Sequence, residues 1–224
     1  MRTKPSFFDS LRYRFTVAGR TEDFYRLQYE RMFRRHYSRK YDCLKVGDLC
    51  LPLMSHAEFP TREEAYYAME IGDILYPALF GSFRYVDEGP YEWGDVGISE
   101  GDVVFDCGAN LGVFSLLAAY RGADVYAFEP ISAARAELRR TLDLNPELKN
   151  RVHVVPAALS DAEGTAEFTV LDGTLVGSSM VLSQQGRKET ARLTTVDAFC
   201  EAEGVSPDFI KADIEGAERQ MMRG

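Results

Sequence analysis

The chain has 224 residues, 46% of them hydrophobic, and a formal net charge of −9, which is typical of a globular protein with one main domain. No apolar run reaches the roughly 18 residues that a membrane-spanning helix needs, and residues 1–10 lack the apolar core of a signal peptide. We therefore expect a cytoplasmic protein without a transmembrane segment. The four cysteines form no C-x-x-C pair and no cluster with histidines, so we predict no metal site.

Charge is distributed unevenly along the chain. Residues 1–45 contain 12 Lys/Arg and 5 Asp/Glu, whereas the remainder contains 14 basic and 30 acidic residues. The basic residues of the first segment are interleaved with aromatic ones, which fits either an amphipathic helix docked on the acidic remainder or a surface for an anionic partner. Nucleic acid is disfavoured as that partner, because the rest of the chain is acidic and carries no recognition motif.

The segment 1–80 is predicted to be an accessory segment that is largely helical. We expect a helix over Thr21–Arg39 and a short strand near Leu49–Leu53. A second helix is expected over Arg62–Leu75, because a capping-box pattern precedes it and Pro77 discourages its continuation.

The segment 81–224 is predicted to be the main domain, an α/β fold in which short apolar strands alternate with helices. After an irregular entry rich in glycine and aromatic residues, we expect strand, helix, strand, helix and strand, in that order, at 103–105, 111–121, 125–128, 133–144 and 152–155. Strands separated by helices in this way form right-handed βαβ units and a buried parallel sheet.

The next part of the chain departs from simple alternation. A turn pattern at 161–164 between two extended runs predicts a hairpin over 158–170. The polar, glycine-bearing stretches 173–180 and 183–189 are expected to be loops.

A last helix and strand close the predicted domain. A capping-box pattern at Thr194 opens a helix that Gly204 should end, and 209–214 is the fourth core strand. Four parallel strands would leave one sheet edge open. An edge of this kind favours pairing with another chain, so an oligomer that forms through it is one expectation.

The most informative segment is the run DCGANLG at 106–112, between the first core strand and the next helix. Glycines at the carboxyl end of a buried parallel strand permit positive φ and let a ligand approach the main chain. Glu129, at the end of the next strand, can accept hydrogen bonds from both hydroxyls of a ribose. The spacing lacks both the dinucleotide pattern and the triphosphate loop, which disfavours NAD and ATP and favours S-adenosylmethionine as the cofactor.

Four blocks of the sequence follow one another along the chain: DCGANLG at 106–112, AFEP at 127–130, ALSD at 158–161 and FIKADIEGAE at 209–218. In this order they resemble the FkbM family of S-adenosylmethionine-dependent methyltransferases, and the last block is the most specific. The resemblance implies a class I methyltransferase with a Rossmann-like sheet, here apparently truncated after the fourth core strand. It also implies O-methylation of a hydroxyl on a small molecule, such as a sugar, another glycan or a secondary metabolite.

Polar residues at the ends of strands are the candidate cofactor ligands, because open α/β sheets bind ligands beyond those ends. Asp106 would orient the loop or the methionine amino group, and Glu129 would bind the ribose. The Ser160–Asp161 region would face the adenine edge, and Asp213 would lie near the sulfonium. The complete predicted cofactor site is Asp106, Gly108, Asn110, Gly112, Glu129, Ser160, Asp161 and Asp213.

Methyl transfer to oxygen depends mostly on positioning, and it needs a base only to take the hydroxyl proton. The candidate catalytic residues are Asp213, Glu215 and His56. Lys211, Asp213 and Glu215 occupy alternate positions of an otherwise apolar strand and are expected to share the face that points to the site. Glu215 and Glu218 could instead cap the following helix.

Two other functions are compatible with the sequence. An NAD-dependent oxidoreductase would have to bind a dinucleotide despite the missing glycine. A truncated, non-catalytic module would bind a nucleoside or a partner chain without turnover. Methylation of an acceptor by residues 1–224 would exclude the second alternative.

Overall fold

The computed structural model describes residues 32–53, 67, 70–80, 91–92, 95–170 and 186–224. His56 and the capping-box pattern at 61–64 lie outside the described residues, as does the predicted loop 173–180.

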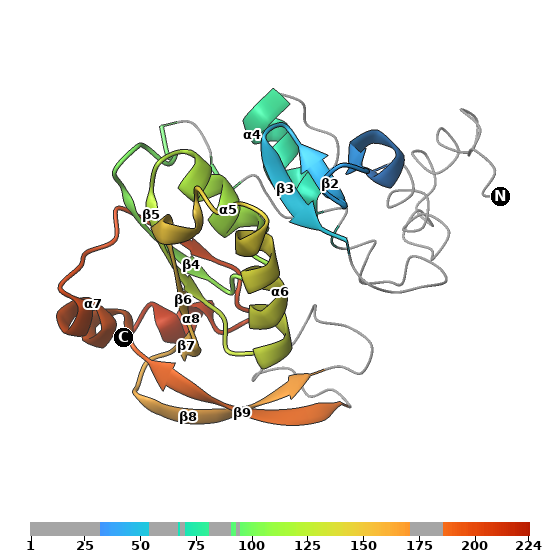
Figure 1. The fold of residues 1–224 in the computed structure, drawn as a ribbon. Coiled ribbons are helices and arrows are strands. Elements are labelled where there is room, and N and C mark those ends of the chain that lie inside the picture. The colour runs from blue at the N-terminus through green and yellow to red at the C-terminus, as the bar shows by residue number, and fades with distance from the viewer. Residues whose placement is uncertain (1–31, 54–66, 68–69, 81–90, 93–94, 171–185) are drawn as a thin grey trace, which may run out of the picture.

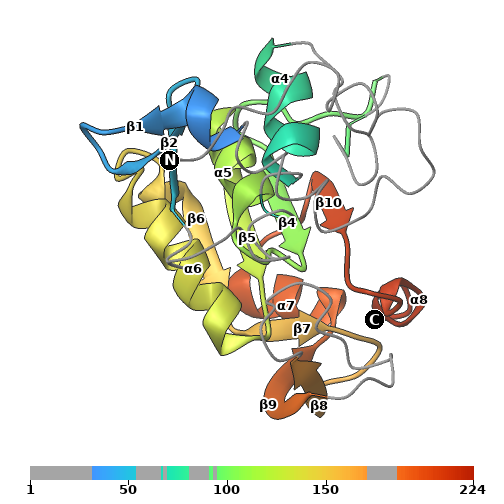
Figure 2. The same ribbon diagram turned by 90° about the vertical axis from the view of Figure 1, so that its right-hand side faces the viewer.

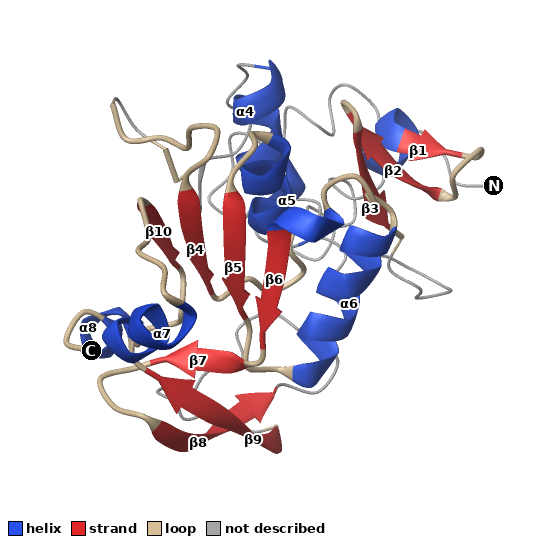
Figure 3. Ribbon diagram, turned by 60° about the vertical axis from the view of Figure 1, so that its left-hand side comes forward, coloured by secondary structure: helices blue, strands red, loops and turns tan. Residues whose placement is uncertain are grey.

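Four parallel strands form the central sheet, in the order β10-β4-β5-β6. In chain order they are β4 (Val103–Cys107), β5 (Asp124–Phe128), β6 (Val152–Val155) and β10 (Phe209–Ala212). Their arrowheads point to the same side of the molecule (Figure 3), so the residues that follow these strands gather there. The predicted α/β fold with a parallel sheet is confirmed.

The direction of strand addition reverses at β4, because β5 and β6 lie on one side of it and β10 on the other. Figure 2 shows the four strands side by side, with β6 and β10 at the two edges. Within the described residues, β10 pairs with β4 alone.

Helices cover both faces of this sheet because neighbouring strand residues point in opposite directions. The helices are α5 (Val113–Tyr120), α6 (Ser132–Asp143), α7 (Val196–Glu203) and α8 (Glu218–Met221). Val104 belongs to the large apolar cluster that includes α5 and α6. Phe105 points to the opposite face of the sheet. There it packs against Phe128 of β5 and Phe199 of α7, whose ring centroids are 5.2 and 5.5 Å from its own.

The ends of the helix and strand after residue 194 differ slightly from prediction. The N-cap of α7 is Thr195, whose Oγ1 accepts a hydrogen bond from the Ala198 amide at 3.0 Å, whereas Thr194 is the last residue of a strand. Gly204 ends the helix with a left-handed φ of 68°, as predicted. The strand β10 stops at Ala212 rather than at residue 214.

A second, three-stranded sheet consists of β7 (Ala157–Leu159), β8 (Gly164–Val170) and β9 (Arg187–Thr194). Its order is β7-β9-β8, so the predicted hairpin over 158–170 is wrong: β9 lies between its two strands. The predicted loop 183–189 is also wrong from Arg187 onward. Local turn signals favoured pairing of neighbours, but β9 supplies the pairing from a distant part of the chain.

The described part of the accessory segment is less helical than predicted. Helix ends before Tyr37, and β1 (Tyr37–Ser38), β2 (Cys43–Val46) and β3 (Leu49–Pro52) form an antiparallel sheet. Only the strand near Leu49 had been expected.

The predicted helix stop before Pro77 is also wrong. A π-helical segment, η1 (Ile71–Leu75), continues directly into α4 (Tyr76–Phe80). The wide turns of η1 come immediately before Pro77, which has no N–H to donate to the preceding turn.

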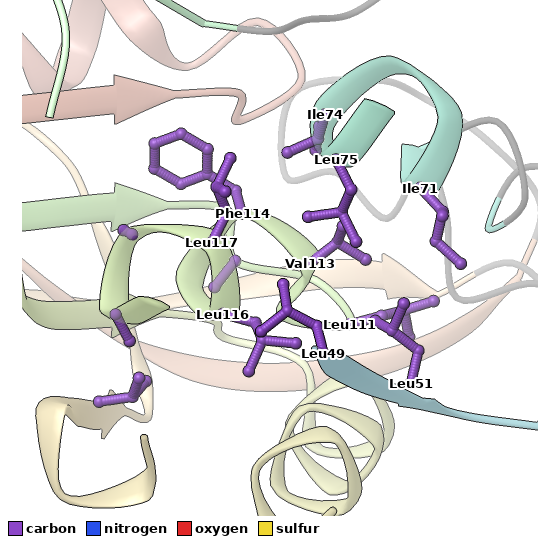
Figure 4. Close-up of a cluster of buried hydrophobic side chains, with 14 of the residues drawn as sticks. Leu49, Leu51, Ile71, Ile74, Leu75, Leu111, Val113, Phe114, Leu116 and Leu117 are labelled. Atoms are coloured by element: carbon purple, nitrogen blue, oxygen red, sulfur yellow. The ribbon is translucent and has the colours of Figure 1, made fainter. Parts of the chain in front are cut away.

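One apolar cluster joins the accessory segment to the sheet. Leu49 and Leu51 of β3 and Ile71 and Ile74 of η1 pack with the residues of α5 (Figure 4). β2, β3 and α4 lie at the opposite end of the molecule from β8 and β9 (Figure 1). Described residues on both sides of position 80 therefore share one core, and the domain boundary there stays a prediction. In the described part of the chain, every helix is too short or too polar to cross a membrane.

Candidate functional site

The fold brings most of the predicted site residues to the ends of three neighbouring strands. Asp106 and the glycine loop, residues 108–112, lie at the end of β4. Glu129 follows β5 directly, and Asp213 follows β10 directly. This is the point at which strand order reverses, where open α/β sheets bind ligands.

The glycine loop is a main-chain surface built from left-handed residues. Gly108, Asn110 and Gly112 have φ values of 78°, 48° and 83°. A side chain at Gly108 would also collide with the sheet, because its Cβ would lie 2.0 Å from the carbonyl oxygen of Asp213. The Oδ1 atom of Asn110 is buried and has no hydrogen-bond partner among the described residues. The loop therefore presents an unsatisfied acceptor, which a ligand donor would satisfy.

Glu129 links the glycine loop to α6. Its side chain is 6% exposed; Oε2 accepts from the Asn110 amide at 2.9 Å, and Oε1 accepts from the Ile131 amide at 2.8 Å. Burial raises the pKa of Glu129 to about 7, although these two amides and the nearby Lys211 favour the charged form. A carboxylate can accept about four hydrogen bonds, so roughly two acceptor sites remain for a ligand diol.

Asp106 is completely buried beneath the loop. Its Oδ2 accepts a hydrogen bond from Ser115 Oγ of α5 at 2.6 Å, and its Oδ1 lies 3.1 Å from Lys211 Nζ. These contacts tie Asp106 to α5 and β10, and both roles predicted for it, orientation of the loop and of a methionine amino group, stay predictions.

Lys211 connects β10 to both Asp106 and the loop. Its Nζ, on a side chain 5% exposed, donates to the carbonyl oxygen of Gly108 at 2.7 Å. Burial alone would lower the pKa of Lys211, but neighbouring carboxylates, Asp106 foremost and then Asp213, outweigh it and raise the pKa above its usual value. Lys211 is therefore charged at neutral pH.

Asp213 is half-buried, and an aromatic hydroxyl holds its carboxylate. Tyr91 donates from its hydroxyl to Asp213 Oδ2 at 2.8 Å. The ring of Tyr91 lies edge-on to Phe114 of α5, and Lys211 Nζ is 5.3 Å from its centroid. Tyr91 thus covers the buried ion pair while it contacts Asp213.

The other two acidic residues of this segment lie beyond the strand. Because β10 ends at Ala212, strand alternation does not extend to Glu215, which is exposed and has a left-handed φ of 54°. Glu218 Oε1 accepts from the amides of Ile214 and Gly216 at 3.3 and 3.2 Å. The expectation that 211, 213 and 215 share one strand face is therefore wrong for Glu215. Glu218 lies in the first turn of α8, but it bonds to the segment before the helix rather than to the N-terminal amides of the helix.

The FkbM methyltransferase domain family matches residues 106–224, which is more than half of the chain and includes the glycine loop, Glu129 and Asp213. The chain belongs to the FkbM methyltransferase family.

Two curated relatives agree with this family. The 31-O-demethyl-FK506 methyltransferase FkbM of Streptomyces tacrolimicus is 33% identical over 59% of this chain and 48% of its own length. The methyltransferase sdnD of Sordaria araneosa is 29% identical over 54% of this chain and 59% of its own length. The chain therefore spans about half the length of these relatives.

A solved structure of a methyltransferase FkbM from Methylobacillus flagellatus KT is also similar. It is 14% identical, with a TM-score of 0.42, and the match covers 88% of this chain and 43% of that one. At that TM-score the likeness is loose, and the family assignment comes from the sequence matches.

Ser160 and Asp161, which were predicted to face the adenine edge, follow β7. Ser160 is buried; its amide donates to Thr194 O at 2.9 Å, and its hydroxyl donates to Asp161 Oδ1 at 3.3 Å. Asp161 is exposed. The second sheet is tied to the start of α6, because Glu189 Oε1 accepts from the Ser132 amide at 2.8 Å. This bond lies at the start of β9, whereas Ser160 bonds to Thr194 at the end of that strand.

Sequence reasoning missed one residue that the structure places at the candidate site. Ser115, a buried hydroxyl in the otherwise apolar helix α5, carried a readable signal, because a polar side chain there needs a partner. The aromatic residues of the entry segment, Tyr91 among them, could be interpreted as lining a substrate or cofactor mouth, but the bond to Asp213, 122 positions away, could not be predicted. Lys211 was placed at the site but was given no role.

Proposed function

We propose that this FkbM domain uses S-adenosylmethionine to methylate a hydroxyl group of a small molecule, such as a sugar or a secondary metabolite. The observation that carries the proposal is the Glu129 carboxylate, which is bonded to the glycine loop and still has acceptor capacity at the strand-order reversal. The relative named 31-O-demethyl-FK506 methyltransferase supports an oxygen acceptor.

The charges around the loop favour a cationic ligand. Asp106 neutralises Lys211, which leaves Asp213 and Glu129 as the acidic groups at the rim of the loop; Glu129 is only partly charged near neutral pH, because burial raises its pKa to about 7. Arg135, a residue of α6, donates a hydrogen bond from its guanidinium to the main-chain oxygen of Glu129. Rim carboxylates attract a sulfonium and repel a diphosphate, which supports S-adenosylmethionine over NAD.

The residues present fit this cofactor. Glu129 would accept hydrogen bonds from the ribose hydroxyls, and Ser160 and Asp161 would face the adenine edge. The buried Oδ1 of Asn110 would accept from a donor of the amino-acid end, beside Gly108 and Gly112. When bound, S-adenosylmethionine supplies a methyl group that is already activated by the positive sulfur.

The chain's own contribution to methyl transfer is to position the acceptor and to take one proton. The acceptor oxygen forms a bond to the methyl carbon as the bond between that carbon and sulfur breaks. The hydroxyl proton goes to a carboxylate oxygen or a histidine. We propose Asp213 as the first candidate, because Tyr91 fixes its carboxylate next to the loop. Glu215, which is exposed, and His56, outside the described residues, stay candidates.

The competing proposal is a module that binds a nucleoside or a partner chain without turnover. The unpaired side of β10, within the described residues, favours it, because an exposed strand edge can accept another strand. An oligomer formed through this edge is a proposal of the same kind. Transfer of a labelled methyl group by residues 1–224 to any hydroxyl acceptor would exclude the non-catalytic module.

The cofactor proposal is tested by calorimetric titration with S-adenosylhomocysteine and, separately, with NAD. We expect the first to bind and the second not to. Glu129→Ala should weaken binding by about 1–3 kcal/mol, the range for stranding hydrogen-bonded partners. Glu137→Ala is the matched control, because Glu137 lies on α6 and pairs with Arg140, and it should bind as the wild type does. Unchanged affinity in folded Glu129→Ala protein would remove the ribose assignment, and binding of NAD alone would overturn the cofactor.

A further inference from the structure

In three consecutive peptide groups of the glycine loop, both the N–H and the carbonyl oxygen form hydrogen bonds. In the Cys107–Gly108 peptide, the oxygen accepts from the Asp213 amide at 3.1 Å and the nitrogen donates to Phe128 O at 3.0 Å. In the next peptide, the Ala109 nitrogen also donates to Phe128 O at 3.0 Å, and the Gly108 oxygen accepts from Lys211 Nζ at 2.7 Å.

The third peptide of the loop is fixed in the same way. The Ala109 oxygen accepts from the Gly112 amide at 2.8 Å, and the Asn110 nitrogen donates to Glu129 Oε2 at 2.9 Å. Four of these six hydrogen bonds are to main-chain groups, and the other two are to the side chains of Lys211 and Glu129. Sequence changes can therefore release the loop most directly at these two residues.

Such restraint is needed because left-handed backbone at a residue other than glycine is unfavourable and persists only when its surroundings impose it. Asn110 has a φ of 48° and lies within two residues of both left-handed glycines. Rotation of the Gly108–Ala109 peptide would break the Lys211 bond and turn the following residues away from Glu129. Lys211 therefore acts on the shape of the surface to which a ligand would bind.

We propose that Lys211 is a positioning residue that holds the glycine loop in its ligand-binding shape before any ligand arrives. Three links of Lys211 carry this inference: its bond to Gly108 O, its ion pair with Asp106, and its cover by the ring of Tyr91. Its ion pair is a direct cross-strand pair, because Lys211 of β10 is in register with Asp106 of β4. The choice of ligand for the test rests on the proposed function, whereas the restraint on the loop does not.

The test separates the bond to the loop from the burial of charge. Lys211→Met alone would leave Asp106 buried without its partner, so we use the double variant Lys211→Met/Asp106→Asn, which removes both charges and also the bond to Gly108 O. The control double variant, Lys188→Met/Glu167→Gln, removes an exposed ion pair of the second sheet. Both are compared with the wild type for unfolding midpoint, hydrogen exchange of the loop amides and affinity for S-adenosylhomocysteine.

We expect the Lys211/Asp106 variant to unfold near the wild-type midpoint and to exchange its 108–110 amides at least about tenfold faster, since the loss of one hydrogen bond to a charged group is of that size. Its affinity for S-adenosylhomocysteine should fall by at least about tenfold for the same reason. The control should match the wild type in both. The proposal would be overturned if the exchange rates of the 108–110 amides and the affinity for S-adenosylhomocysteine both stayed within twofold of the wild-type values.

Two further results keep the outcomes distinct. If the wild type does not bind S-adenosylhomocysteine, the cofactor proposal fails, and loop exchange alone decides the role of Lys211. If the double variant does not fold, the Lys211 ammonium is observed in the wild type by nitrogen-15 NMR. A slowly exchanging, hydrogen-bonded ammonium at neutral pH supports the proposal, and rapid exchange with water overturns it.

Discussion

The two halves of the site differ in how they are built. The cofactor half consists of the glycine loop and Glu129, whose groups are buried and bonded to one another over short stretches of chain. The acceptor half consists of Asp213, which is half-buried, and Glu215, which is exposed. Asp213 is held by Tyr91, a residue far away in the sequence. The proposed cofactor half is thus held by nearby residues together with Lys211 of β10, whereas the proposed acceptor half depends on a contact between distant segments.

The largest expected effect comes from removal of the cation that supports the cofactor half. Lys211→Met should lower the free energy of unfolding by about 3–5 kcal/mol, because a buried carboxylate loses its partner. Denaturant unfolding measures this change. The double variant with Asp106→Asn should recover most of the loss, and equal instability of the two variants would show that the ion pair is not the cause.

The next largest effect concerns the shape of the loop itself. Gly108→Ala should destabilise the protein by about 3 kcal/mol, because it combines left-handed strain with a collision against Asp213 O. Gly101→Ala is the matched control: Gly101 has a φ of 88° but no atom within 4 Å of an added Cβ, so only about 1 kcal/mol is expected. Equal thermal midpoints for the two variants would contradict the close approach of the loop to β10.

The pH dependence of stability should reveal the burial of Glu129. Its pKa is about 7 in the folded protein against an ordinary value of 4.5, so the folded state holds this proton more tightly. The resulting stabilisation, up to about 3 kcal/mol, is fully present below about pH 4.5 and is lost as the pH rises through about 7. Unfolding measured from pH 5 to 8 should show this loss in the wild type and not in Glu129→Gln. An identical slope in the variant would mean that Glu129 is not buried as described.

The smallest effect is expected on the acceptor half. Tyr91→Phe keeps the ring over Lys211 but removes the hydroxyl that donates to Asp213, and it should cost about 1 kcal/mol of stability. Affinity for S-adenosylhomocysteine should stay within about twofold of wild type, since Tyr91 supports the acceptor half. A large loss of affinity would show that the two halves are not separable in this way.

The same contrast explains what the sequence could predict. The strands and helices from β4 to β6 agree with prediction because apolar runs, caps and turns specify them locally. The glycine loop and Glu129 were identifiable because their residue types and spacing have a direct chemical meaning.

The remaining features depend on pairings that no local pattern specifies. β9 enters between β7 and β8, which gave the wrong hairpin. Lys211 meets Gly108 across 103 positions, so its charge was visible in the sequence but its role was not. The π-helical segment η1 packs with α5 in one apolar cluster, a contact that no local signal contained.

The most direct test of the central claim is a nitrogen-15 NMR titration of the wild-type protein with S-adenosylhomocysteine. The account predicts that the largest shifts occur at the amides of Asn110 and Ile131, which donate to Glu129, and at Gly108 and Gly112. Shifts confined to other parts of the chain, or no shifts in a folded sample at millimolar ligand, would contradict it.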